Sequence, residues 1–233
     1  MKRQVRVIEL GTMRYADALA LQKEMFERVK TEQSPDTLLL VEHPHVYTLG
    51  SQTDKRNLLY TPEQLAARGI EIFEIERGGD ITYHGYGQLV AYPILNLRHF
   101  YLDAHRYLRD LEETIIQTLK AFGIEAHRKS HPNPKKNYTG VWVGDEKICA
   151  IGVKFSQWTT MHGLALNINT DLSFFEGIVP CGISEMGVTS LQKLLGKPVP
   201  MQHAVEQFIE SFEGVFEVKI LTRTNYGKAE SND

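Results

Sequence analysis

The chain contains the stretch Thr139-Gly140-Val141-Trp142-Val143-Gly144-Asp145-Glu146-Lys147-Ile148-Cys149-Ala150-Ile151-Gly152-Val153-Lys154-Phe155. Two strand-like runs, 139–143 and 147–155, stand on either side of Gly144, Asp145 and Glu146. A short Gly- and Asp-containing connection between apolar runs is typical of a β-hairpin, which predicts two antiparallel strands here. Antiparallel neighbours point away from a purely parallel, doubly wound sheet, whose strands are separated by helices.

The remaining elements are spread on both sides of this hairpin. Strand-like patterns cover 5–10, 37–42, 71–76, 88–95 and 162–168, and a polar surface loop is expected over 51–57. Apolar residues at helical spacing predict helices over 15–29, 103–123 and 200–216. Asp103 is the expected N-cap of the second helix and Gly123 ends it, while Pro200 opens the third helix. No regular β-α-β alternation is present. The order therefore predicts one α/β domain of the α+β type with a mixed sheet over residues 1–221, followed by a disordered polar tail over 222–233.

Composition limits the class of protein. The chain has 233 residues, a formal net charge of −3 and 42% hydrophobic residues, as expected for a soluble domain with one large core. Such a balance argues against a nucleic-acid binder, which is usually strongly basic. No apolar run reaches the roughly 20 residues that span a bilayer, and no secretory signal begins the chain. Two cysteines do not form a disulfide framework, so we expect a reduced, cytoplasmic protein without a membrane partner.

The segment from Arg77 to Gln88 has the composition of a binding loop. Four glycines within it allow close approach of the backbone to a ligand, and Arg77, Thr82 and His84 supply polar groups nearby. The alternative is a pair of tight turns with solvated side chains. Neither a Walker A loop nor the Rossmann glycine spacing is present.

Histidines offer a weak metal signal. His43 and His45 are two residues apart in an extended segment and point the same way. No further ligand stands at a recognisable spacing, so no metal is predicted. A metal-dependent hydrolase built on His43, His45 and His84 is kept as a minor alternative.

Two thiols and two lysines are candidates for nucleophilic chemistry. Cys181 lies in a turn between Pro180 and Gly182, whereas Cys149 lies in an apolar strand, so Cys181 is the better nucleophile. The alternative is that Cys181 is an inert loop cysteine. A neighbouring ammonium would lower the thiol pKa. Lys147 and Lys154 would face opposite sides of an uninterrupted strand, so only one can line a shared pocket, and parity leaves open which.

Several separated motifs resemble one family, the lipoyl(octanoyl) transferases of lipoate biosynthesis. They fit in order from about Val5 to Phe216, and the glycine-rich segment together with Pro180-Cys181-Gly182 is the most specific part. Tyr86 stands where the family usually has Pro, and Lys154 where Arg is more frequent. The other matching motifs are His43-Pro44-His45-Val46-Tyr47-Thr48-Leu49-Gly50, Tyr92-Pro93, Thr139-Gly140-Val141-Trp142-Val143-Gly144, Lys147-Ile148-Cys149-Ala150-Ile151-Gly152 and His162-Gly163-Leu164-Ala165-Leu166-Asn167.

This resemblance implies the catalytic fold shared by biotin and lipoate protein ligases, with Cys181 as nucleophile and Lys147 as its lysine. It implies an acyltransferase that takes octanoyl from octanoyl-acyl carrier protein onto Cys181 as a thioester. The acceptor would be the lipoyl-domain lysine of 2-oxoacid dehydrogenases or the glycine-cleavage protein. An activated thioester needs no cofactor. The implied substrate-binding residues are Arg77, Gly78, Gly79, Asp80, Ile81, Thr82, Tyr83, His84, Ala150, Ile151, Gly152, Gly163, Leu164 and Ala165.

Two other functions are open on the same fold. An ATP-dependent lipoate or biotin ligase would not need Cys181, and a non-catalytic acyl-binding protein would gain nothing from a Cys181–Lys147 pair. The basic segment 127–137 is a candidate docking surface for the acidic carrier protein, against the alternative of a solvated loop.

Overall fold

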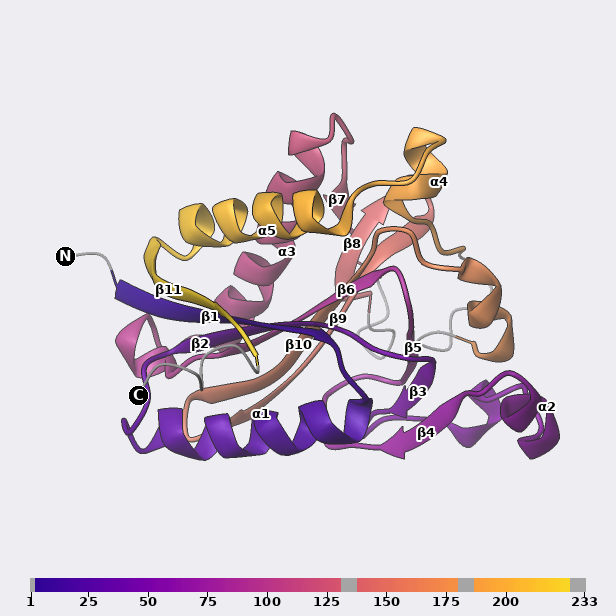
Figure 1. The fold of residues 1–233 in the computed structure, drawn as a ribbon, viewed down its shortest axis with the longest axis horizontal. Coiled ribbons are helices and arrows are strands. Elements are labelled where there is room, and N and C mark those ends of the chain that lie inside the picture. The colour runs from indigo at the N-terminus through magenta and orange to yellow at the C-terminus, as the bar shows by residue number, and fades with distance from the viewer. Residues whose placement is uncertain (1–2, 131–137, 180–186, 227–233) are drawn as a thin grey trace.

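The computed structural model describes residues 3–130, 138–179 and 187–226. Its main element is an eight-stranded mixed sheet in the order β11-β1-β2-β6-β10-β9-β8-β7 (Figure 1). The strands are β1 (Arg3–Thr12), β2 (Thr37–Glu42), β6 (Gln88–Ile94), β7 (His127–Arg128), β8 (Gly140–Val143), β9 (Glu146–Ser156), β10 (Thr159–Asn167) and β11 (Val218–Asn225). β1 runs parallel to β2 and β11, and the other pairs are antiparallel. The predicted 139–155 hairpin is confirmed as β8 and β9.

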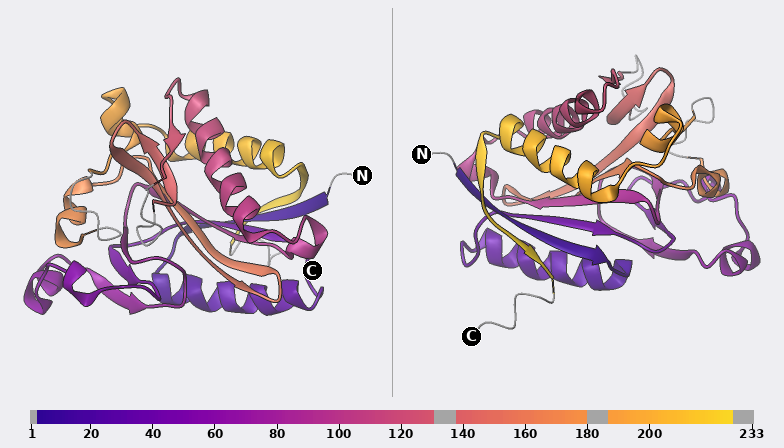
Figure 2. Two further views of the ribbon diagram at one scale, coloured as in Figure 1. Left: turned by 180° about the vertical axis from the view of Figure 1, so that it is seen from behind. Right: turned by 45° about the horizontal axis from the view of Figure 1, so that its top comes forward.

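Helices cover both faces of this sheet (Figures 1 and 2). α1 (Tyr15–Lys30) packs on one face, where Met25, Phe26 and Val29 meet residues of β2, β6 and β10. α3 (Ala104–Ala121) and α5 (Met201–Val215) cover the other face and form the larger core. The apolar spacing that predicted the three helices is therefore the spacing of their buried stripes.

Local signals place the helix ends. Asp103 accepts a hydrogen bond from the Arg106 N–H at 2.9 Å, as an N-cap should. Gly123 follows α3 with a φ of +74°, which a glycine adopts without strain. A capping box at Thr61 and Gln64 opens α2 (Pro62–Ala67), a helix the apolar pattern did not predict. The short α4 (Leu191–Leu195) begins after Ser190.

A second, three-stranded sheet lies beside the main one, in the order β4-β3-β5. It comprises β3 (Val46–Leu49), β4 (Glu71–Glu74) and β5 (Ile81–His84). Tyr47, Ile81 and Tyr83 are fully buried in a small core of its own. This sheet holds the glycine-rich segment against the main sheet, because Arg77 to Asp80 lead directly into β5.

The predicted tail is partly wrong. Thr222 to Asn225 are the last residues of β11 and pair with β1 from Arg6 to Glu9. Polar side chains concealed this strand from the apolar pattern because it forms the sheet edge. Residues 227–233 lie outside the described part of the chain. Within the described part, no helix is long and apolar enough to cross a membrane.

Candidate functional site

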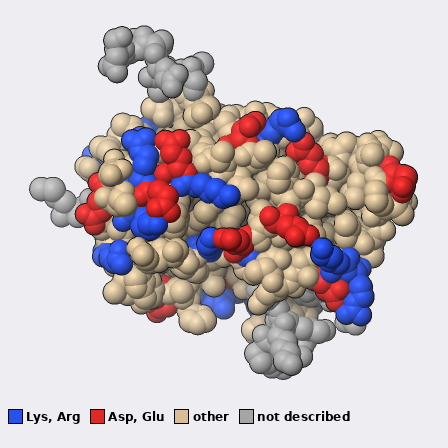
Figure 3. Space-filling view, turned by 90° about the horizontal axis from the view of Figure 1, so that it is seen from below, with Lys and Arg blue, Asp and Glu red and all other residues tan. Residues whose placement is uncertain are grey.

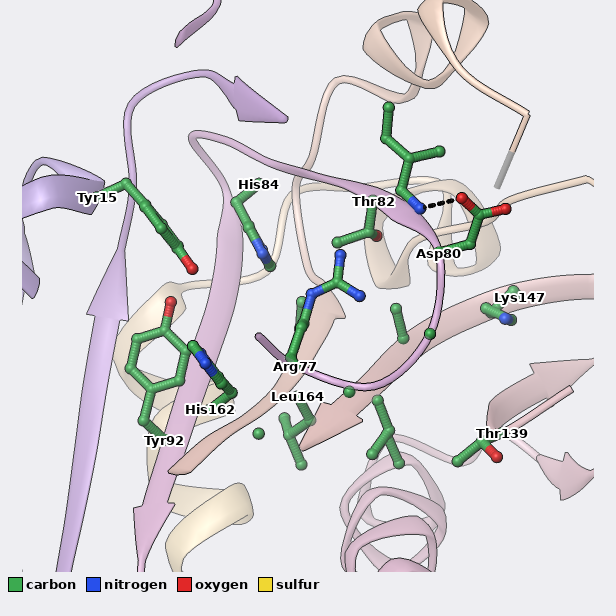
Figure 4. Close-up of a pocket in the computed structure, with 17 residues that line it drawn as sticks. Tyr15, Arg77, Asp80, Thr82, His84, Tyr92, Thr139, Lys147, His162 and Leu164 are labelled. Atoms are coloured by element: carbon green, nitrogen blue, oxygen red, sulfur yellow. Dashed lines mark hydrogen bonds between the residues drawn. The ribbon is translucent and has the colours of Figure 1, made fainter. Parts of the chain in front are cut away.

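A narrow pocket, here the β9–β10 pocket, lies where the glycine-rich segment crosses the main sheet (Figure 4). Its floor consists of two alternate rungs of the sheet, Ala150 with Ala165 and Gly152 with Gly163, which lie on the same face with the Ile151–Leu164 pair between them. All four residues have a methyl group or no side chain, so nothing larger than a methyl group projects from the floor into the cavity of about 40 Å³. Small residues at these four positions on one face of two paired strands suit a straight apolar ligand.

The glycine at 152 is required by the segment that covers the floor. The Gly78 N–H donates to the Val153 carbonyl at 2.9 Å, which holds the loop directly on β9. A Cβ at Gly152 would lie 2.9 Å from Arg77 Cδ and 3.0 Å from the Gly78 carbonyl oxygen. A side chain at this position would therefore lift the covering loop off the sheet.

Arg77 places a buried cation in the pocket. Its guanidinium donates to the carbonyl and the hydroxyl of Thr48 at 2.8 and 2.9 Å, and the side chain is 7% exposed. Burial and this positive charge act together on nearby imidazoles. The pKa of His84 is lowered well below its ordinary value, first by burial and then by the charges around it, including Arg77.

His84 is held as a neutral donor. The Gln88 side-chain amide donates to the Tyr83 carbonyl and to Asn167 Oδ1, which leaves Gln88 Oε1 as an acceptor. His84 Nδ1 therefore donates to Gln88 Oε1 at 2.9 Å. Burial and Arg77 similarly lower the pKa of His162 to about 3.

Tyr92 lines the inner end of the pocket, and His43 is hydrogen-bonded to its hydroxyl. His43 Nδ1 donates to the Met13 carbonyl at 2.7 Å, so Nε2 accepts from the Tyr92 hydroxyl at 2.8 Å. Burial lowers the pKa of His43 to about 4 and keeps the ring neutral. Both ring nitrogens are thus engaged, and His45 Nδ1 is bonded to Tyr83. This disfavours the metal alternative, and the described residues contain no group of three His, Cys, Asp or Glu arranged to hold an ion.

Lys147 reaches the outer end of the pocket from β9. The side chain is buried at 7% exposure, and Nζ lies 4.8 Å from the centre of the Trp142 ring. The Lys147 N–H donates to the Gly187 carbonyl, and the Lys147 carbonyl accepts from Thr189. Figure 4 shows Lys147 and Thr139 at one end of the pocket and Tyr15, Tyr92 and His162 at the other, with Arg77 between them.

A β-bulge changes the parity argument for the two lysines. Trp142 pairs with Lys147, but Val141 pairs with Cys149, so Ile148 is an extra residue in β9. Ile148 and Cys149 consequently both pack in the core beneath α3 and α5. Uninterrupted alternation would place Lys147 on the same face as Cys149. Because of the bulge, Lys147 lies instead on the face of Ala150 and lines the same pocket. Lys154 lies elsewhere, in an ion pair with Glu76.

The structure describes only one of the two cysteines. Cys181 lies outside the described residues. Cys149 is fully buried, and burial raises its thiol pKa above the ordinary value, as expected for an inert cysteine.

The pocket brings together most of the predicted substrate-binding residues. Gly78 and Tyr83 do not line it, since Gly78 is bonded to β9 and Tyr83 is buried in the small-sheet core. Tyr15, Tyr92, Thr139 and His162 line it without having been predicted as site residues. Three of these four, Tyr92, Thr139 and His162, stand in motifs that resemble the family, so the resemblance could have indicated them as site residues. The predicted residues that line the pocket are Arg77, Gly79, Asp80, Ile81, Thr82, His84, Lys147, Ala150, Ile151, Gly152, Gly163, Leu164 and Ala165.

The basic segment 127–137 is only partly described. Arg128 is bonded to Glu112 and Glu113 of α3, and Lys129 pairs with Asp145 at 2.5 Å. The side chains of Arg128 and Lys129 therefore form ion pairs within the fold. Lys135 and Lys136 lie outside the described residues.

Comparison with known proteins defines the class. The sequence matches the family described as "Lipoyl protein ligase A/B catalytic domain" over residues 14–213, most of the chain. The chain belongs to this family. Within it, the sequence is similar to an octanoyltransferase from Rubrobacter xylanophilus, with 50% identity over 207 residues that cover 88% of this chain and 90% of the relative.

Solved structures confirm the predicted fold. A putative lipoate protein ligase from T. acidophilum superposes with a TM-score of 0.73 at 16% identity, covering 99% of this chain and 92% of that one. Biotin protein ligase from Aquifex aeolicus gives a TM-score of 0.50 at 12% identity, covering 93% and 70%. At these identities the likeness concerns the fold alone.

Proposed function

We propose that this chain transfers an octanoyl group from octanoyl-acyl carrier protein to the lysine of a lipoyl domain, through a thioester on Cys181. The observation that carries the proposal is a buried lysine at the outer end of a slot whose floor is formed by Ala150, Gly152, Gly163 and Ala165. A ligase that activates a free acid with ATP requires no such lysine beside a cysteine. The sequence similarity to octanoyltransferases supports the same choice.

Contacts at the two described ends of the segment that contains Cys181 support the pairing of Cys181 with Lys147. At one end of this segment, the Lys147 N–H donates to the Gly187 carbonyl, and at the other end the Val179 N–H donates to the Asn57 carbonyl. Asn57 in turn donates through its side chain to Asp80, a pocket residue. An ammonium close to a thiol favours the thiolate, which is the nucleophilic form.

The reaction follows from these parts. The Cys181 thiolate attacks the carbonyl carbon of the donor thioester, and the carrier thiolate leaves with a proton from Lys147. The acceptor amine then attacks the acyl-enzyme, an amide bond forms, and Lys147 takes up the amine proton as Cys181 leaves. Backbone N–H groups near the glycines are available to stabilise the oxyanion in both steps. No metal enters these steps, so we expect EDTA to leave the rate unchanged.

Intact mass after mixing with octanoyl-acyl carrier protein tests the proposal. The protein should gain one octanoyl group without ATP, and a lipoyl domain should then remove it. Cys181→Ala should gain no mass, whereas the matched variant Cys149→Ala should behave as the wild type. Strict dependence on ATP, or labelling that survives Cys181→Ala, would favour the ligase or another nucleophile.

A further inference from the structure

His162 has an unusual conformation for a residue in the middle of a strand. Alternation along β10 places it with Leu164 and Leu166, which pack beneath α3 and α5. Its φ is +62°, in the left-handed region, and its ring borders the β9–β10 pocket instead. Left-handed geometry costs a non-glycine residue about 1–2 kcal/mol, and such strain tends to occur at functional positions.

His162 lines two cavities. One is the β9–β10 pocket. The other is an open groove of about 390 Å³ between α1 and β4, here the α1 groove. Apolar side chains of Leu19, Phe26 and Met161 form part of this groove. Its rim is charged, and Figure 3 shows acidic and basic side chains side by side on the face that carries α1 and β4.

The distance from the reacting end to His162 matches a chain of eight carbons. Lys147 Cε lies 3.5 Å from where a Gly140 Cβ would stand, and Gly140 pairs with Ala150. Three residue steps separate Ala150 from Val153, the partner of His162, which is about 10 Å along the strand. An extended octanoyl chain, a zigzag of carbon–carbon bonds of ~1.5 Å, is about 9 Å long.

We propose that the His162 imidazole closes the inner end of the acyl slot and thereby limits the acyl chain to about eight carbons. This inference rests on the proposed function and adds its chain-length specificity. When the ring is removed, the pocket and the α1 groove join, and the tail of a longer chain enters the groove. Each methylene buried there should improve transfer about fourfold.

The test compares octanoyl and dodecanoyl thioesters of acyl carrier protein in transfer to a lipoyl domain. His162→Gly removes the ring and also suits the left-handed backbone, and His162→Asn tolerates the same φ with a shorter side chain. Lys23→Ala is the matched control, since Lys23 lines the α1 groove and not the β9–β10 pocket. We expect both His162 variants to raise the dodecanoyl-to-octanoyl ratio of kcat/KM at least about tenfold, and Lys23→Ala to leave it unchanged.

Calorimetric binding of octanoate and dodecanoate gives a second readout that does not need turnover. A relative gain in dodecanoate affinity in the His162 variants would support the inference even if transfer is lost. The inference would be overturned if the wild type transfers octanoyl but the folded His162 variants show the wild-type ratios of kcat/KM and of affinity for the two chain lengths. That result would leave the proposed function standing. Absence of acyl transfer by the wild type would instead refute the proposed function.

Discussion

Gly163→Ala should destabilise the protein, because the neighbouring strand β6 leaves no room for a methyl group at this position. A Cβ at Gly163 would lie 2.1 Å from the Ala91 carbonyl oxygen and 2.8 Å from Pro93 Cδ. Carbon and oxygen rarely approach closer than about 3.3 Å, so β10 and β6 must separate locally by about 1.2 Å. That displacement stretches the rung between Leu164 and Ala91 beyond hydrogen-bonding distance.

The expected cost combines overpacking, about 1–3 kcal/mol, with one or two ladder hydrogen bonds of about 1 kcal/mol each. A loss of about 2–5 kcal/mol corresponds to a fall in Tm of roughly 5–15 °C for a chain of this size. Thermal unfolding followed by circular dichroism, with urea titration in parallel, measures it. The control is Gly214→Ala in α5, where a Cβ meets nothing within 4 Å and helix propensity should raise stability by about 0.5–1 kcal/mol. A Tm for Gly163→Ala equal to that of the wild type would refute the steric argument.

Three further predictions concern charge and protonation. Alkylation of Cys181 by iodoacetamide should show a thiol pKa below about 8.5 that rises in Lys147→Ala and not in Lys154→Ala; the reverse pattern would contradict the assignment of Lys147. The pKa of His43 is about 4 in the folded protein against about 6.5 unfolded, so the unfolded chain binds more protons between these values. The free energy of unfolding should therefore fall by up to about 3 kcal/mol as the pH drops through this window. Urea titrations at pH 7 and 4.5 measure this fall, and it should be smaller in His43→Gln. Lys135→Glu with Lys136→Glu should raise KM for octanoyl-acyl carrier protein several-fold at low salt and less at 1 M, where the Debye length is about 3 Å; equal KM values at low salt would leave the segment as plain surface.

The larger helices and the apolar strands could be read from the sequence because their signals are local. Asp103, Gly123 and Pro200 act on their own helix ends, and the hairpin turn at Gly144 and Asp145 fixes the register of its two strands. Strands β3 and β5 were missed because nearly all of their residues are buried, so neither shows the alternation of apolar and polar residues that marks a half-exposed strand. Their stability comes from tertiary packing of Tyr47, Tyr83 and neighbouring rings, which no local pattern reports.

The sequence predicted most of the residues that line the pocket, but not the strand face on which each side chain lies. The resemblance supplied the residues that line most of the pocket. Strand alternation could not supply the side on which Lys147 lies, because the bulge at Ile148 depends on pairing with β8. His162 was missed for a related reason. Its left-handed φ reverses the face assigned by alternation, and a histidine gives no sequence signal for that conformation.

The parallel pairing of β1 with β11 joins segments more than 200 positions apart. Arg3 pairs with Val218, and Glu9 pairs with Asn225. Neither strand can fray alone without exposing the backbone N–H groups of the other, so the two should open as a single cooperative unit. Hydrogen exchange should therefore report matched protection for 5–9 and 218–224. Deletion of 218–226 would turn β1 into an open sheet edge, a surface on which a second chain can add a strand and begin to aggregate.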